Sequence, residues 1–440
     1  MLNERTRKEA ARWYPLKPVA QQIQLMNDAR RFIVVPAGRR SGKTERAKRK
    51  VAKAAMLNPG ERYFCAAPTR EQAKRIYWAD MKLLCYSSLS PRMPSESELI
   101  IYLANGAEVH IIGLDKPSRM EGILWSGGVV DEIADVKPDA WALNIRPALD
   151  TERPDRPGYA AWCWLIGVPE GFNHFYELAE YAQNSGDPDW GYYHWVSAEV
   201  VSAEKVDQAR RQMSMIQFNQ EYNARFETAS GRIYADYSKA NHTLETIRPH
   251  EQLIWAHDFN YTPLSSCIGV RRRAPTDTRD QIYILDEIVL ESAVARQSAL
   301  EFVQKFANHA NKKVQIYGDP AGRAGEKHGQ QSNYTEIEKV LVAHGWKFQR
   351  LVTDAAPAIV DRQNALRAKI QNAAGERSLF VNPRTAKMTD KGLKSTQLKK
   401  GSTFIEEVAD HQHITTAVGY WIERDYPTHI GAAQRTNLKG

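Results

Sequence analysis

The chain has 440 residues, 42% of them hydrophobic, which is enough to bury the cores of two or three domains. No apolar run approaches 18 residues and no apolar leader opens the chain, so we expect neither a membrane span nor a secretory signal. Four dispersed cysteines fit no disulfide framework or zinc site, which favours a reducing cytoplasm. The net charge is +8, and residues 1–50 hold 14 Lys/Arg against 4 Asp/Glu, which favours a polyanionic partner.

Short apolar runs alternate with helical patterns in the first half of the chain. Buried strands of this kind, joined by helices, indicate a mostly parallel sheet that is covered on both faces. We therefore predict an α/β domain over residues 1–228. Its strands are expected at 32–36, 63–68, 108–112, 127–131 and 161–168.

A phosphate-binding loop follows the first of these strands. The sequence Ala37-Gly38-Arg39-Arg40-Ser41-Gly42-Lys43-Thr44 stands between a strand and a helical pattern, as a P-loop requires. Its small residues let backbone N–H groups surround the phosphates of ATP. Lys43 is expected to contact the β- and γ-phosphates, and Thr44 to place its hydroxyl on Mg²⁺. Ala37 replaces the usual first glycine and tolerates a positive φ poorly, so we expect a different entry turn.

Two acids end the strand at 127–131, as the partner of a P-loop should. Asp131 is expected to hold Mg²⁺ and Glu132 to polarise the attacking water. Weaker candidates surround this pair. Gln21 or Gln22 could read an adenine edge, and the sequence GVPEG at 167–171 could sense the γ-phosphate. Candidates for an arginine finger are Arg39, Arg40 and Arg119, the last serving a neighbouring subunit.

Carboxylates mark a second site in the other half of the chain. After a junction at 229–250, strands are expected at 253–259, 264–270, 281–290 and 313–319, with helices at 294–310 and 411–424. Asp258 and Asp319 end two of the strands, and Asp410 opens the last helix. Such acids can converge on two divalent metals, Mg²⁺ or Mn²⁺, which clamp a phosphodiester. Competing candidates for this site are Asp286, Glu287, His411 and His413.

Basic segments flank this second site. Three arginines stand at 271–273, and residues 384–402 carry six Lys/Arg among turn-forming and polar residues. We expect the latter to form a loop that follows a nucleic-acid backbone without reading its sequence, or else a solvated β-hairpin.

With both sites in view, the chain resembles the large terminase subunit of tailed bacteriophages. The resemblance rests on PAGRRSGKT, VVDEIAD, GVPEGFNHFYEL and FNQEYNARFETASGRIYADYS, and on the acids near Asp258, Asp319 and Asp410. It implies an ASCE-type P-loop ATPase domain over 1–228, an RNase H-like, resolvase-type nuclease domain over 251–425 and a tail over 426–440. Its cofactors would be ATP and Mg²⁺, with Mn²⁺ possible at the nuclease site.

The resemblance also implies partners and residue roles. A ring, commonly pentameric, would dock on the portal protein of a procapsid in the cytoplasm of the infected host. There it would move double-stranded DNA that a small terminase subunit has selected. The roles carried over are nucleotide and metal contacts for Lys43, Thr44 and Asp131, hydrolysis for Glu132, a trans-acting arginine at Arg119, and nuclease ligands at Asp258, Asp319 and Asp410.

Two departures from the family pattern limit this transfer. Gly167 and Val168 replace the Ser or Thr that usually precedes the proline of the coupling motif, which puts coupling in doubt. The last helix reads Thr416-Ala417-Val418-Gly419-Tyr420 where an aspartate is usual, so Asp410 is the least secure ligand.

The function expected is an ATP-driven DNA-packaging motor that also cuts concatemeric DNA. The alternatives are a nuclease-dead motor, a cellular repair ATPase–nuclease and a non-enzymatic DNA-binding assembly factor.

Overall fold

The computed structural model divides the chain into two compact units. It describes residues 4–150, 160–228, 231–260, 262–273, 280–324, 331–399, 402 and 404–428. The first unit comprises Met1–Val206 and Asn219–Thr228, and the second comprises Asp207–Phe218 and Ala229–Gly440. Residues 429–440 of the expected tail lie outside the described residues. No described helix is long and apolar enough to cross a membrane.

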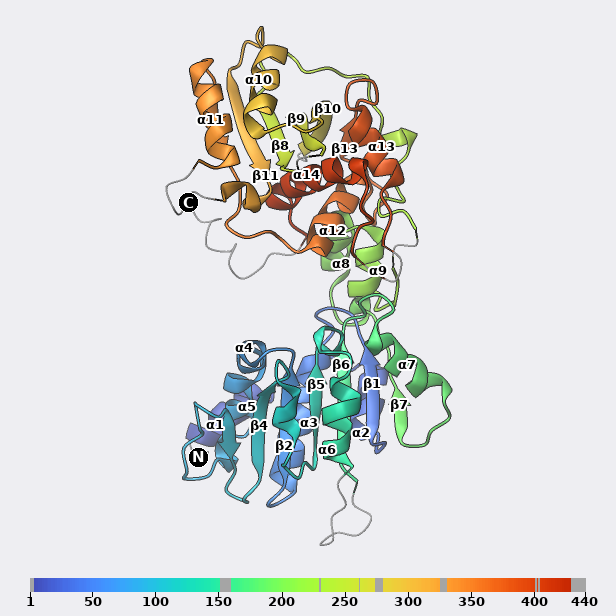
Figure 1. Ribbon diagram of the computed structural model, residues 1–440. Coiled ribbons are helices and arrows are strands. Elements are labelled where there is room, and N and C mark those ends of the chain that lie inside the picture. The colour runs from blue at the N-terminus through green and yellow to red at the C-terminus, as the bar shows by residue number, and fades with distance from the viewer. Residues whose placement is uncertain are drawn as a thin grey trace. The chain divides into compact units, whose positions relative to one another are not determined.

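The first unit is built on a seven-stranded sheet in the order β3-β4-β2-β5-β6-β1-β7 (Figure 1). All strands are parallel except β3, which pairs antiparallel with β4 at one edge. The bounds are β1 Phe32–Pro36, β2 Arg62–Ala67, β3 Ile100–Tyr102, β4 Glu108–Gly113, β5 Gly127–Asp131, β6 Trp162–Gly167 and β7 Trp190–Tyr192. The single strand β6 therefore lies between the P-loop strand β1 and the acid-bearing strand β5, the order of ASCE-type ATPases.

Helices cover both faces of this sheet because its central strands alternate their side chains between two cores. In β1, Ile33 and Val35 enter the core that contains α3, whereas Phe32 and Val34 enter the opposite core. The helices are α1 Glu4–Arg12, α2 Ala20–Asn27, α3 Lys43–Leu57, α4 Arg70–Ala73, α5 Ala79–Leu84, α6 Arg146–Leu149 and α7 His174–Asn184. Helices α8 Ala203–Gln212 and α9 Met215–Glu221 lie where the chain passes between units.

The second unit contains a six-stranded mixed sheet in the order β12-β11-β8-β9-β10-β13. Strands β8, β9 and β10 form an antiparallel meander, β11 and β12 continue parallel to β8, and β13 pairs parallel with β10. The bounds are β8 Leu253–Asp258, β9 Leu264–Arg273, β10 Asp280–Leu290, β11 Lys313–Gly318, β12 Lys347–Arg350 and β13 Leu379–Val381. Three antiparallel strands followed by two parallel ones give the topology of the RNase H-like fold.

Helices also sandwich this second sheet. Helices α10 Ala295–Lys305 and α11 Asn333–Ala343 cover one face, where they pack on Leu253 and Trp255. Helices α12 Ile359–Ile370, α13 Lys387–Ser395 and α14 Asp410–Asp425 cover the other, packing on Ile254 and Ala256. Successive side chains of β8 thus point to opposite faces of the sheet, so that each group of helices packs on every second residue of this strand.

The predicted α/β fold class is confirmed, and most predicted strands match within about two residues. The segment 384–402 differs from the prediction, because α13 occupies its middle instead of a loop or hairpin. Residues 400 and 401 of that segment lie outside the described part of the chain.

Candidate functional sites

The P-loop begins with extended backbone rather than with the usual glycine turn. Ala37 is fully buried and continues β1 through a bridge to Trp195. The positive φ angles fall later, at Arg40 (58°) and Gly42 (88°). Gly42 precedes α3, whose start has no side-chain cap. The first N–H groups of α3 can therefore bind an anion.

Gly38 is required for a steric reason. A Cβ at this position would lie 2.6 Å from the Ser197 nitrogen and 2.7 Å from the Tyr222 carbonyl oxygen. The same segments bind the loop, because the Gly38 N–H donates to the Trp195 carbonyl and the Ser197 hydroxyl donates to the Arg39 carbonyl at 2.7 Å. The loop is thus held from outside the motif.

The residues expected at the Mg²⁺ position converge. The Thr44 hydroxyl donates to Asp131 Oδ2 at 2.8 Å, joining the start of α3 to the end of β5. Lys43 Nζ lies 3.8 Å from Glu132 Oε1. Glu132 has a left-handed backbone, with φ 49° and ψ 49°, and its side chain is 36% exposed. Such strain at a non-glycine residue is typical of functional sites, and here it turns Glu132 out of the sheet.

The electrostatics of Asp131 favour a cation. Its side chain is buried, and burial, followed by repulsion from Glu132, raises the pKa of Asp131 to about 6 despite the nearby Lys43. A buried carboxylate next to a second acid is costly unless a positive charge neutralises it. A hydroxyl and a carboxylate in contact are also the oxygen ligands that Mg²⁺ prefers. Thr44 and Asp131 therefore fit a nucleotide-bound Mg²⁺.

Sequence reasoning missed Tyr77 at this site. Its buried hydroxyl donates to the same Asp131 oxygen at 3.0 Å. Tyr77 lies in a π-helical segment, Lys74–Trp78, between α4 and α5. Helical distortions of this type are frequent at functional sites. No local motif marks the residue, because an apolar helix with Ile76, Tyr77 and Trp78 reads simply as core.

The accessory candidates have mixed outcomes. Gln22 is buried, its amide nitrogen donates to the Ser41 carbonyl at 2.7 Å, and its oxygen accepts from Arg46 at 3.0 Å. In this structure Gln22 therefore supports the P-loop backbone. Arg39 forms an ion pair with Glu221 at 2.8 Å, and both Arg39 and Arg40 are exposed.

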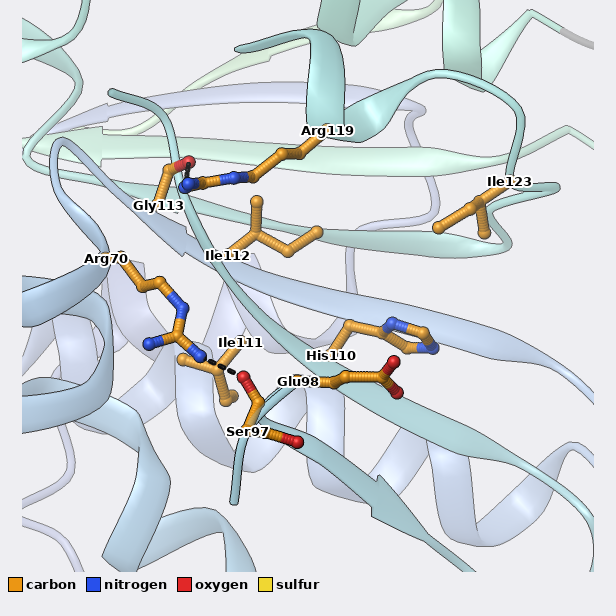
Figure 2. Close-up of a pocket in the computed structure, with 9 residues that line it drawn as sticks. All are labelled: Arg70, Ser97, Glu98, His110, Ile111, Ile112, Gly113, Arg119 and Ile123. Carbon is orange, nitrogen blue, oxygen red and sulfur yellow. Dashed lines mark hydrogen bonds between the residues drawn. The ribbon is translucent and has the colours of Figure 1, made fainter. Parts of the chain in front are cut away.

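Arg119 lies at the β4 side of the sheet, in the 3₁₀ helix Pro117–Met120. Its guanidinium donates to the Gly113 carbonyl at 3.1 Å and to Asp115 at 2.9 Å, and its side chain is 37% exposed. Figure 2 shows Arg119 and Arg70 lining one pocket of about 260 Å³ beside the end of β4. Arg119 is thus partly exposed and bonded within its own chain, and its role toward a neighbouring subunit stays a prediction.

The segment after β6 contacts the turn that follows Asp131-Glu132. His174 Nε2 bonds the Ile133 carbonyl at 2.8 Å, and Asn173, which caps α7, lies 3.4 Å from the Ala134 carbonyl. Although Gly167 and Val168 depart from the family pattern, hydrogen bonds join the turn after Asp131 and Glu132 to the start of α7.

At the second site, two of the three predicted acids lie on adjacent strand ends. Asp258 ends β8, and Asp319 follows β11, whose Gly318 is in register with His257. Asp319 N–H donates to the His257 carbonyl at 3.2 Å, and its Oδ1 accepts from the Ala321 N–H at 2.8 Å. Parallel strands that end side by side thus bring both carboxylates to one edge of the sheet.

Helix α14 contributes His413 and Tyr420 to this edge. His413 Nδ1 lies 3.0 Å from Asp258 Oδ2, and this contact is the main cause that raises the pKa of His413. Burial raises the pKa of Tyr420 to about 12, and its hydroxyl interacts with Asp319. The two residues are seven apart, so they share one helix face. His413 was a competing candidate in the sequence, whereas Tyr420 was not recognised.

Asp410 lies on the same helix but is exposed. Within the described ranges, no three His, Cys, Asp or Glu side chains are close enough together to hold a metal ion. Asp258 and Asp319 are oxygen ligands of the kind that a hard divalent cation prefers, and all three predicted ligands stay predictions. The other candidate acids serve elsewhere: Asp286 pairs with Lys305 at 2.6 Å, and Glu287 accepts the N–H groups that begin α13.

Comparisons with known proteins show which proteins the chain resembles. No protein-family model matches the chain. It is 26% identical over 289 residues to the terminase large subunit of Escherichia phage T5, covering 62% of this chain and 63% of that protein. It is also 26% identical over 252 residues to the terminase large subunit of Thermus phage G20c, covering 50% of each. The chain thus spans less than two thirds of the curated relatives it matches.

A solved structure has the same fold as this chain over almost the full length of both chains. The large terminase of a thermophilic bacteriophage superposes with a TM-score of 0.63 at 15% identity, covering 93% of this chain and 99% of that one. The resemblance to phage large terminase subunits is confirmed. Structures of the same thermophilic-phage terminase with ATP-γ-S and with ADP match with TM-scores of 0.59 and 0.58. The two units therefore have the fold of a large terminase.

Proposed function

We propose that this large-terminase relative hydrolyses ATP to move double-stranded DNA into a procapsid. The observation that carries the proposal is the contact of Thr44 with Asp131, beside Lys43 and Glu132, at the carboxyl ends of β1 and β5. The fold shared with the large terminase of the thermophilic phage, which binds ATP-γ-S and ADP, supports it.

Each residue of the first site has a defined role in this proposal. Residues 38–42 and the first N–H groups of α3 surround the phosphates, and Lys43 binds the β- and γ-phosphates. Thr44 and Asp131 hold Mg²⁺, which when bound neutralises phosphate charge. When nucleotide is bound, the Glu132 side chain would leave its position near Lys43 and orient the attacking water. Arg119 of one subunit reaches the nucleotide of its neighbour, so that turnover requires the ring.

We further propose that the second unit cuts concatemeric DNA. Asp258 and Asp319, with Asp410 as the third acid, hold Mg²⁺ or Mn²⁺, which when bound activates water and stabilises the leaving oxygen. His413 orients Asp258 through its Nδ1, and Tyr420 supports Asp319. The proposal includes a ring, of five subunits by family analogy, on the portal protein in the host cytoplasm. A small terminase subunit would supply the DNA.

A nuclease-dead motor is the second candidate function. One observation favours it: the described part of the second unit shows no group of three ligating side chains. In that case Asp258 and Asp319 would hold a structural ion, and the motor alone would be active.

Two variants test these proposals separately. Lys43→Ala should abolish ATP turnover while leaving plasmid cutting intact, because it removes the phosphate contact in the first unit and leaves the second unit unchanged. Asp258→Asn should abolish Mn²⁺-dependent plasmid cutting while leaving ATP turnover intact. Unchanged ATP turnover in the first variant would reject the motor. Cutting at the parental rate in the second would reject the nuclease and leave the nuclease-dead candidate.

A further inference from the structure

An arginine next to the second site has no ionic partner among the described residues. Arg362, on α12, lies with its guanidinium carbon 4.4 Å from the centroid of the Tyr420 ring. Its Nε is buried without a hydrogen-bond partner. Across the described ranges, no carboxylate forms an ion pair with it. The residue as a whole is only half-buried, so its terminal nitrogens remain accessible.

Tyr420 connects Arg362 to the carboxylates of the second site. Tyr420, on which the guanidinium stacks, interacts through its hydroxyl with Asp319 and lies in the field of Asp258. Glu423, on α14, senses the positive charge of Arg362. Burial, followed by Asp361, raises the pKa of Glu423, whereas Arg424 and Arg362 lower it. The Tyr420 side chain therefore lies between the Arg362 guanidinium and the Asp319 carboxylate.

Two carboxylates at one edge repel a DNA phosphate, and a fixed cation beside them offsets that repulsion. The planar guanidinium suits this task because it can donate two parallel hydrogen bonds to phosphate oxygens. Stacking on Tyr420 fixes its plane before DNA arrives. A salt bridge within the protein would have neutralised the charge, and the described residues provide none.

We propose that Arg362 binds a backbone phosphate of the DNA strand held at the Asp258–Asp319 centre. The inference rests on the proposed nuclease function and extends it to a residue that no motif or comparison marks. Because the contact is to phosphate, it should be independent of DNA sequence.

The test measures the salt dependence of DNA binding by the full chain. An Asp258→Asn parent prevents cutting, and a short blunt duplex of mixed sequence is titrated by fluorescence anisotropy at several NaCl concentrations. Adding Arg362→Gln should make the slope of log K against log salt shallower by about 0.9, the value for one lost phosphate contact. Arg296→Gln is the matched control, since Arg296 is exposed on α10, across the sheet.

A second readout separates phosphate binding from a purely structural role. In the otherwise native chain, Arg362→Gln should lower plasmid cutting at least about tenfold, and Arg362→Lys should lower it less because the charge is kept. Melting temperature and ATP turnover should stay near parental values in both.

The outcomes decide between the two levels of the proposal. A salt slope that stays unchanged with Arg362→Gln overturns the inference. The combination of an unchanged slope, a lowered melting temperature and full cutting by Arg362→Lys also overturns it, because Arg362 would then have a purely structural role. If the Asp258→Asn parent binds no duplex and the native chain cuts no plasmid, the nuclease function itself fails. A shallower slope with the Arg296 control unchanged supports the phosphate contact.

Discussion

At the scale of single residues, Asp131 shows how a binding site is built at the expense of the free protein's stability. Thr44 and Tyr77 both donate to one of its oxygens, yet burial still raises its pKa to about 6. In the unfolded chain an aspartate ionises near 3.9. The folded state without nucleotide therefore binds the Asp131 proton more tightly than the unfolded chain does, and the associated stability is present below about pH 4 and lost as the pH rises through about 6.

This linkage predicts a pH-dependent gain for Asp131→Asn. Relative to the native chain, the free energy of unfolding without nucleotide should be similar at low pH and higher at about pH 8, by up to about 3 kcal/mol. The same variant should lose the extra stabilisation that Mg²⁺ with ADP gives the native chain. Thermal unfolding at several pH values measures both effects. Exposed Asp139→Asn is the control, and a pH-independent difference for Asp131→Asn would contradict the prediction.

A second residue-scale prediction concerns His413 and Asp410. His413→Ala should lower the cutting rate by about 10- to 100-fold, because Asp258 loses the side chain that orients it at 3.0 Å. Asp410→Asn decides the identity of the third acid. A comparable loss would support Asp410 as a metal ligand. Cutting at the native rate would exclude Asp410 as a ligand and leave His413 as the residue at the start of α14 that the second site needs. Initial rates on plasmid at saturating Mn²⁺ measure both variants.

At the scale of elements, the P-loop predicts opposite effects for two neighbouring substitutions. Gly38→Ala should weaken ADP binding more than about tenfold, because its Cβ would meet the backbone at Ser197 and Tyr222. Ala37→Gly restores the usual motif but should change affinity less than about twofold, since Ala37 already lies in extended backbone. Equilibrium binding of a fluorescent ADP analogue compares them. Equal losses for the two variants would refute the steric explanation.

Elements also show where sequence reasoning reached its limit. The longer strands and the loops at Lys43 and Asp131 were predictable because each is encoded within a few residues, whereas the short strands β3, β7, β12 and β13 were not predicted. Helix α13 was not, because its first N–H groups are capped by Glu287 from β10, about 100 residues away in sequence. Its segment contains Gly392 and few apolar residues, so only tertiary contacts make it helical. Tyr77 was hidden for the same reason, since its partner lies on another element.

At the scale of the whole molecule, many basic side chains near the N-terminus form ion pairs within the protein. The net charge of this segment alone had favoured a polyanionic partner. Arg12 pairs with Glu45 and Asp80, and Lys48 also pairs with Asp80. Arg31 pairs with Asp150 and Asp189. Much of the basic N-terminal segment therefore holds α1, α3 and the sheet edges together. Arg362, far along the chain and without an ion pair among the described residues, is a more specific candidate for contact with DNA.

If Arg119 acts on the nucleotide of a neighbouring subunit in a ring, two inactive variants should restore ATP turnover when they are mixed. Lys43→Ala keeps Arg119 but cannot bind phosphate, whereas Arg119→Ala keeps the P-loop but offers its neighbour no finger. In an equimolar mixture that assembles at random, about a quarter of the interfaces join an intact P-loop to an intact Arg119. ATP turnover should therefore recover in the mixture although each variant alone is inactive. If Arg119→Ala alone turns over ATP normally, or if no ratio restores activity, Arg119 does not act in trans.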